Sequence, residues 1–240
     1  MKVVRIQTGH YGRTTGATGG YNADLDLAEK DMNHDLTNEV VAILDADPWL
    51  SSVIDWEFVG PDDKLGAPCD LFVSVHHDAN NSKTAARPSV GYPVASADHV
   101  RPVVDFWKEL YGNIDGALAF RSDNYTSALR LYYAWKSAYS GAAPIKLLFE
   151  MEFMTNDERA LWAIEHRRQL ANNIILTALF AFGIERPSPP PTPSTKAPIN
   201  DLEARLKSLE FKVNRAATIN ARQARYINGL QTRVTALEQR

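Results

Sequence analysis

The chain has 240 residues, 45% of them hydrophobic and 23% charged, so most of it can bury a core and disorder throughout is excluded. A net charge of −3 excludes binding to nucleic acid through an excess of basic residues. The single cysteine, Cys69, excludes a framework of intramolecular disulfides and is expected to be a small core residue. No apolar run is long enough to span a membrane.

Strand-like and helix-like patterns alternate along the first three quarters of the chain. The predicted strands cover 3–6, 52–56, 70–75 and 146–150. The predicted helices cover 25–44, 100–111, 126–139 and, as one or two long helices, 156–182. Alternation of this kind predicts an α/β body of three layers, with a mostly parallel twisted sheet flanked by helices.

A proline-rich segment, residues 187–199, is expected to be an extended linker between a body of residues 1–186 and a tail of residues 200–240. The tail repeats every seven residues at two sets of positions: Leu202, Leu209, Ala216, Gln223, Leu230 and Leu237, and Leu206, Val213, Asn220, Ile227 and Val234. This heptad pattern predicts a C-terminal coiled-coil helix that makes the protein a homo-oligomer. The alternative is a monomeric helix that folds back on the body.

Side chains capable of chemistry stand at the ends of predicted elements. His10 follows the first strand, Glu29 lies near the start of a helix, and His76 and His77 end the strand over 70–75. Neighbours in a strand face opposite sides, so at most one of these two histidines can share a site with His10. Two imidazoles and one carboxylate are the protein ligands expected of a catalytic zinc, and ligands gather at the carboxyl ends of parallel strands.

Four motifs together resemble the zinc-dependent N-acetylmuramoyl-L-alanine amidases, which cut peptidoglycan between the lactyl group of muramic acid and L-alanine. They are Gly9-His10, Glu29-Lys30-Asp31-Met32-Asn33, Phe72-Val73-Ser74-Val75-His76 and Leu148-Phe149-Glu150-x-x-Phe153-x-x-Asn156, and they span roughly residues 3–183. The resemblance implies that Zn²⁺ is bound by His10, Glu29 and His76. It also implies that Glu150 is the catalytic carboxylate.

The chain departs from the family pattern at two places. His77-Asp78 replaces the usual Ala-Asn, and Glu152 stands where the family has glycine. His77 is expected to be structural or to support a ligand, with Asp78 as its partner or as a turn residue. Glu152 would either disturb the pKa of Glu150 or point away from the site, and Glu152→Gly is expected to be tolerated.

The start of the chain lacks the apolar core of a signal peptide. Together with the resemblance to a wall enzyme, this suggests a phage endolysin that is made in the host cytoplasm and acts on the bacterial cell wall after a holin releases it. Two other classes remain open. One is a metallocarboxypeptidase-like zinc enzyme, for which Arg87, Arg121 or Arg130 would grip a terminal carboxylate. The other is a non-catalytic wall-binding phage protein with a degenerate amidase body.

The other conspicuous side chains have plainer expected roles. The aromatic stretch over 131–139 is expected to be core rather than the lining of a glycan groove. His34, His99 and His166 have no motif around them and are expected at the solvated surface.

Overall fold

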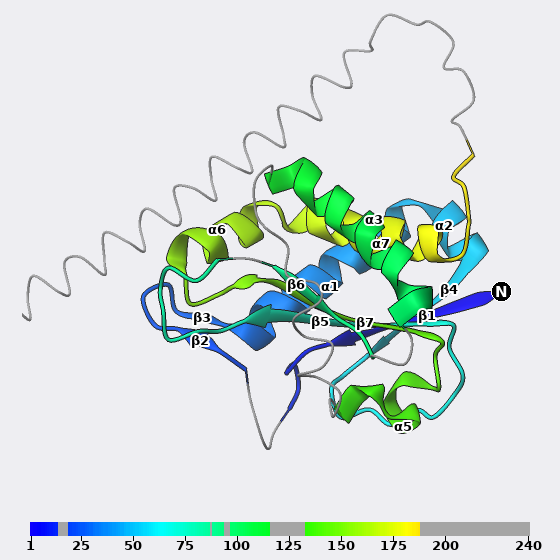
Figure 1. Cartoon of the computed structure of the whole chain (residues 1–240), viewed down its shortest axis with the longest axis horizontal. Coiled ribbons are helices and arrows are strands. Elements are labelled where there is room, and N and C mark those ends of the chain that lie inside the picture. The colour runs from blue at the N-terminus through cyan, green and yellow to red at the C-terminus, as the bar shows by residue number, and fades with distance from the viewer. Residues whose placement is uncertain (14–18, 87, 94–96, 116–132, 188–240) are drawn as a thin grey trace, which may run out of the picture. The chain divides into compact units, whose positions relative to one another are not determined.

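The computed structural model describes residues 1–13, 19–86, 88–93, 97–115 and 133–187. Its centre is a five-stranded sheet in the order β4-β1-β5-β7-β6 (Figure 1). The strands are β1 (Lys2–Thr8), β4 (Ile54–Val59), β5 (Leu71–Asp78), β6 (Ser89–Gly91) and β7 (Ile145–Phe153). The first four in the spatial order run parallel, and β6 pairs antiparallel with β7. The parallel strands therefore end at one edge of the sheet, where the predicted site residues follow them.

Three long helices cover one face of the sheet (Figure 1): α1 (Glu29–Ala46), α3 (Ala97–Asp115) and α7 (Arg167–Ala181). Helix α1 packs on the sheet through one apolar face. Its residues Met32, Leu36, Val40 and Leu44 recur every four residues and are all buried. Burying each such side chain contributes about 1.5–3 kcal/mol. This stripe holds α1 against β1 and β5 and so fixes where its first residue, Glu29, lies.

Shorter elements complete the body. Helix α2 (Pro48–Val53) packs against α1 and β4, and α6 (Asp157–Glu165) follows β7. The 3-10 helix η2 (Tyr133–Trp135) and helix α5 (Ser137–Ser140) lie at the second face of the sheet, where Ala134 packs with Phe72 and Cys69. A two-stranded hairpin, β2 (Tyr21–Asn22) and β3 (Leu27–Ala28), precedes α1.

The second face of the sheet is partly polar although it is buried. Arg5 is 0% exposed; its Nη2 lies 2.6 Å from Glu57 Oε2, and its Nη1 donates to the Ala67 carbonyl. Gln7 lies next to Arg5 on this face and accepts a hydrogen bond from Ser74 at 2.8 Å. The charge of Arg5 is thus paired and hydrogen-bonded, as a buried charge requires.

The predicted α/β fold with a mostly parallel sheet flanked by helices is confirmed. The helix expected over 25–44 begins only at Glu29, because residues 21–28 form the hairpin. The strand expected over 52–56 begins at Ile54, because Pro48 starts a helix that includes Ser52 and Val53. In the aromatic stretch Ala134 is fully buried, and Trp135 and Tyr139 are half-buried, with Trp135 packed against the cluster that contains Ala134.

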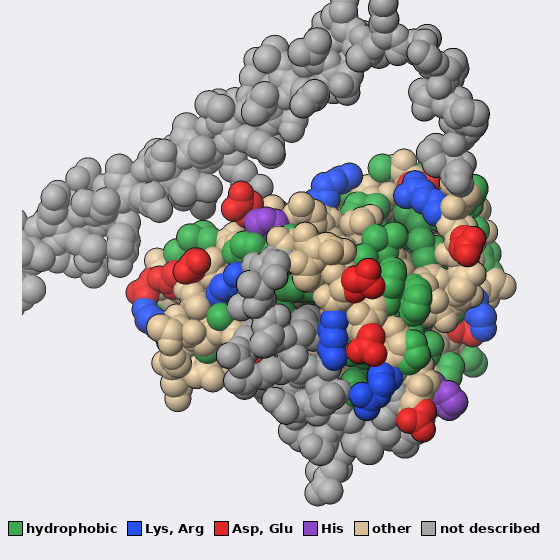
Figure 2. All heavy atoms as spheres, turned by 45° about the horizontal axis from the view of Figure 1, so that its top comes forward, with side chains coloured by type: hydrophobic (Ala, Val, Ile, Leu, Met, Phe, Trp, Pro, Cys, Tyr) green, Lys and Arg blue, Asp and Glu red, His purple; other side chains and the backbone are tan. Residues whose placement is uncertain are grey.

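The three remaining histidines differ in their exposure. His34 and His166 are each half-buried and stack on an aromatic ring, whereas His99 is exposed. Figure 2 shows the helical side of the body, where charged side chains of both signs are interspersed with hydrophobic ones.

All the described elements belong to one compact unit, Met1–Glu185. The predicted coiled coil over 200–240 and residues 126–132 of a predicted helix lie outside the described residues. Among the described helices, none combines the length and the hydropathy that a membrane crossing needs.

Candidate metal centre

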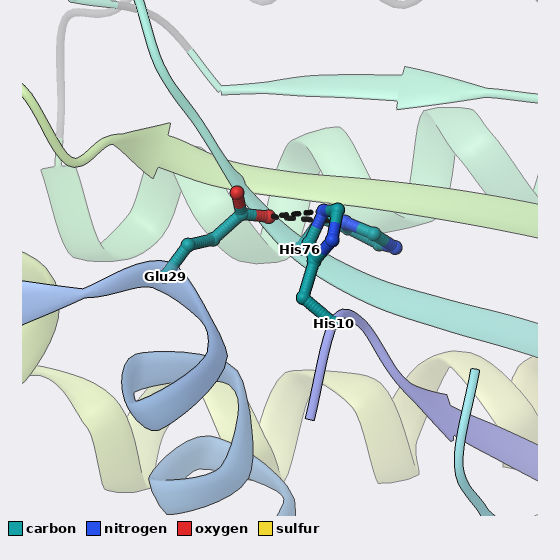
Figure 3. A group of neighbouring side chains, drawn as sticks. All are labelled: His10, Glu29 and His76. Carbon is teal, nitrogen blue, oxygen red and sulfur yellow. Dashed lines mark hydrogen bonds and ion pairs between the residues drawn. The ribbon is translucent and has the colours of Figure 1, made fainter. Parts of the chain in front are cut away.

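His10, Glu29 and His76 converge at the carboxyl edge of the sheet (Figure 3). Each offers one ligand atom, and these three atoms lie within 4.8 Å of one another. Glu29 Oε1 lies 3.0 Å from His76 Nδ1 and 3.4 Å from His10 Nε2. The two imidazole rings meet edge to face, with centroids 4.8 Å apart. Three elements distant in the sequence therefore bring two nitrogens and one oxygen to a single point.

The turn after β1 presents His10. Its φ of 58° lies in the left-handed region, which is uncommon for a residue with a side chain and points to a constrained position. Gly9, just before it, lies directly against His76. A Cβ at Gly9 would be 2.5 Å from Cε1 and Nε2 of the His76 ring, so only glycine leaves room for that ring.

Glu29 is the first residue of α1 and is only 5% exposed. Its second oxygen accepts a hydrogen bond from the Gly20 backbone N–H at 2.8 Å. Burial alone would raise the pKa of Glu29, but the hydrogen bond with His76 and the nearby imidazoles outweigh burial and lower the pKa to about 2. The carboxylate is therefore ionised, as a metal ligand must be.

His76 and His77 have different partners. His76 faces Glu29, whereas His77 Nδ1 lies 2.7 Å from the Asn33 carboxamide oxygen on α1. Burial lowers the pKa of His76 against the opposing effect of Glu29, and it lowers that of His77 to about 4. Both rings are thus neutral at neutral pH, and His76 is the one placed with His10.

Asn33 connects this group. Its amide nitrogen donates to the Gly9 carbonyl at 3.0 Å and lies 3.4 Å from Glu29 Oε1, while its oxygen faces His77. Asp78, rather than Asn33, was expected to be the partner of His77, or else a turn residue; the observed partner of His77 is Asn33. The sequence could have indicated this role of Asn33, because a spacing of four residues puts Asn33 on the same face of α1 as Glu29.

Glu150 lies beside the three residues in the neighbouring strand. It pairs with His76 in the register of β5 and β7, so both side chains leave the same face of the sheet. Its Oε2 atom is buried and has no hydrogen-bond partner among the described residues. Burial, followed by the charges of Asp78 and Glu29, raises the pKa of Glu150 well above its usual value. These surroundings make the ionised carboxylate a stronger base than that of a solvent-exposed glutamate.

A bulge separates Glu150 from Glu152. Two steps along β5, from His76 to Asp78, match three steps along β7, from Glu150 to Phe153. Glu152 accepts hydrogen bonds from Tyr111 of α3 at 2.8 Å and from Arg159 of α6 at 2.5 Å, and is 0% exposed. It points away from the site, which was one of the two expectations for this residue. Glu152→Gly would remove both hydrogen bonds, so we expect it to lower stability, whereas its tolerance in activity stays a prediction.

A carboxypeptidase would need an arginine to grip a terminal carboxylate, and the three candidates, Arg87, Arg121 and Arg130, lie outside the described residues.

Comparison with known proteins places the fold among amidases. No protein-family profile matches the chain, and no curated protein does. An N-acetylmuramoyl-L-alanine amidase from Clostridium difficile 630 is 18% identical, with a TM-score of 0.56 over 76% of this chain and 97% of that chain. The catalytic domain of the amidase CwlV from Bacillus (Paenibacillus) polymyxa is 18% identical, with a TM-score of 0.53 over 77% and 100%. The amidase Ami1 from Mycobacterium smegmatis is 19% identical, with a TM-score of 0.53 over 77% and 98%. At these identities the matches show a shared fold.

Proposed function

We propose that this protein is a zinc-dependent peptidoglycan hydrolase that cleaves the amide bond between N-acetylmuramic acid and the L-alanine of the stem peptide. One observation carries the proposal: His10, Glu29 and His76 converge with Glu150 beside them, on a fold that solved amidases share.

The residues fit a zinc ion. Two neutral imidazoles and an ionised carboxylate are the protein ligands of one common type of catalytic zinc site, in which a further position is left for water. Asn33 contacts both the Glu29 carboxylate and the backbone beside His10, and such contacts orient metal ligands. Bound zinc would lower the pKa of a coordinated water towards ~7 and polarise the scissile carbonyl.

Glu150 is proposed to move the proton in this reaction. Its carboxyl group lies next to His76 with one oxygen unengaged, so it can accept a proton from the attacking water. The same carboxyl group can then deliver that proton to the leaving nitrogen of L-alanine. An amide nitrogen leaves poorly unless it is protonated, which makes a carboxyl group at this point a chemical requirement.

The phage endolysin assignment is part of the proposal. It is supported by the heptad repeats of residues 200–240, which suit an enzyme that acts on an insoluble wall. Several bodies linked through a coiled coil could rebind an insoluble wall before all had left it, which raises avidity without new contacts. The protein would be made in the host cytoplasm and would act on the wall after release.

The test is to digest purified wall fragments with the full-length protein and to identify the new chain end. A free amine on L-alanine supports the amidase, loss of a terminal residue indicates a carboxypeptidase, and no new end indicates a wall-binding protein. Glu150→Gln should keep the metal and lose about 10²–10⁴-fold in turnover. Full turnover by Glu150→Gln would refute the role given to Glu150.

A further inference from the structure

A polar cavity opens beside the candidate metal centre. It has a volume of about 430 Å³ and is lined by Tyr21, Ala79, Asn80, Asn81 and Thr155. This volume falls within the range of about 300–1,000 Å³ that small-molecule sites occupy. The lining comes from three places: the β2–β3 hairpin, the loop after β5 and the end of β7.

The cavity is joined to the centre through the backbone. Tyr21 follows Gly20, whose N–H donates to Glu29, and Ala79 is three residues beyond His76. A Cβ at Gly20 would lie 2.6 Å from the Ala79 side chain, so the hairpin and the loop are in close contact there. The cavity lining is therefore linked to the candidate metal centre through Gly20 and the loop after β5.

Neighbouring contacts hold the two sides of the cavity in place. The Asn22 amide donates to the Met154 carbonyl and to Asp157, which fixes the hairpin to the end of β7. An ion pair between Lys83 and Asp24 joins the loop to the hairpin. The cavity is thus formed by anchored segments.

The lining offers an aromatic ring and neutral hydrogen-bonding groups. Tyr21 is 57% exposed, and its hydroxyl donates to Asp26 at 2.5 Å, so the ring is tethered while much of it stays accessible. Asn80 and Asn81 contribute carboxamides, and Thr155 contributes a hydroxyl that accepts from the Asn80 backbone N–H. None of the five lining residues is charged.

We propose that this cavity binds an N-acetylated sugar ring of the wall glycan, on the muramic acid side of the scissile bond. The inference rests on the proposed function. A sugar ring has an apolar C–H face that suits an aromatic ring, and hydroxyl and acetamido groups that suit amides and hydroxyls. The stem peptide, in contrast, carries free carboxylates and amines, and none of the five lining side chains has a charge to pair with them.

The first experiment measures binding without chemistry. Tri-N-acetylchitotriose, which has no stem peptide, is titrated calorimetrically into the full-length protein. Tyr21→Ala should weaken its binding about tenfold, whereas Tyr21→Phe, which keeps the ring, should bind nearly as well as wild type. Phe180→Ala removes a different exposed aromatic ring, that of an α7 residue which is 44% exposed, and is the control variant, with unchanged affinity expected.

The second experiment compares two substrates, a disaccharide–peptide fragment and the corresponding lactyl-peptide without sugar. Tyr21→Ala and Asn81→Ala should raise KM for the first and leave KM for the second unchanged. Wild-type protein that does not bind the oligosaccharide, or binding that Tyr21→Ala does not alter, overturns the sugar site even if the wall amide is cleaved. Binding that depends on Tyr21 in a protein that cleaves nothing supports the sugar site and refutes the amidase.

Discussion

Gly9 offers the sharpest test of the geometry, because a single methyl group added there should disable the metal centre although no ligand residue is replaced. In Gly9→Ala the new Cβ would lie 2.5 Å from two atoms of the His76 ring and 2.6 Å from the Val75 carbonyl oxygen. Carbon atoms in ordinary contact lie about 3.5–4.0 Å apart, so the ring would have to retreat by about 1 Å.

A displacement of that size is large on the scale of the site. His76 Nδ1 is 3.0 Å from Glu29 Oε1, and a shift of the ring separates the ligand atoms that now converge. We expect zinc affinity to fall about 10–100-fold and turnover to fall about 10²-fold. Overpacking of the same contact should lower the free energy of unfolding by about 1–3 kcal/mol.

Zinc affinity is measured by competition with a chromophoric chelator, and unfolding by denaturant titration of the metal-free protein. Gly112→Ala is the matched control, because a Cβ at Gly112 in α3 meets nothing within 4 Å. That variant should bind zinc like wild type. A Gly9→Ala protein with wild-type zinc affinity and stability would show that the His76 ring does not occupy the described position.

Four further outcomes are expected. His77→Ala should keep zinc and bind it about 10–100-fold more weakly in a chelator titration, since its ring supports the ligands through a neighbour; complete loss of zinc would make it a ligand. Glu152→Gly should cost about 3–5 kcal/mol in denaturant unfolding because Arg159 loses its buried partner; unchanged stability would contradict the buried pair. The Cys69 thiol, whose pKa burial raises to about 11, should resist alkylation at pH 8 until the protein unfolds; rapid labelling of native protein would place it at the surface. By light scattering the full chain should be an oligomer and a chain ending at residue 198 a monomer, and Asn220→Ile should raise the thermal stability of the oligomer; a monomeric full chain at micromolar concentration would exclude the coil.

Periodicity was sufficient for much of the fold. The strand over 70–75 is a continuous apolar run because helices and loops bury both of its faces. The start of β4 could not be placed, because Ser52 and Val53 suit a strand as well as the short helix that Pro48 initiates. Local preference is weak at such boundaries, and packing against α1 decides the outcome.

Only those parts of the candidate site that belong to a single strand or helix could be predicted from the sequence. Polar residues directly after apolar strands indicate His10 and the His76–His77 pair, but the choice between the two histidines came from the family resemblance. The support from Asn33 depends on how α1 docks against the sheet, which no local pattern records. The bulge in β7 could not be predicted from the sequence either, because one additional residue in a strand leaves the strand-like composition unchanged.

That bulge has a consequence for engineering the protein. Carboxylates two positions apart in a regular strand would share one face and one environment, so a change at either would alter both catalysis and folding. Here Glu150 lies beside His76, whereas Glu152 joins β7 to α3 and α6. Catalytic rate and heat resistance can therefore be selected separately within a three-residue stretch. Random libraries at position 150 should yield folded proteins that differ in activity. Libraries at position 152 should yield proteins with an intact active site that differ in the stability of the fold.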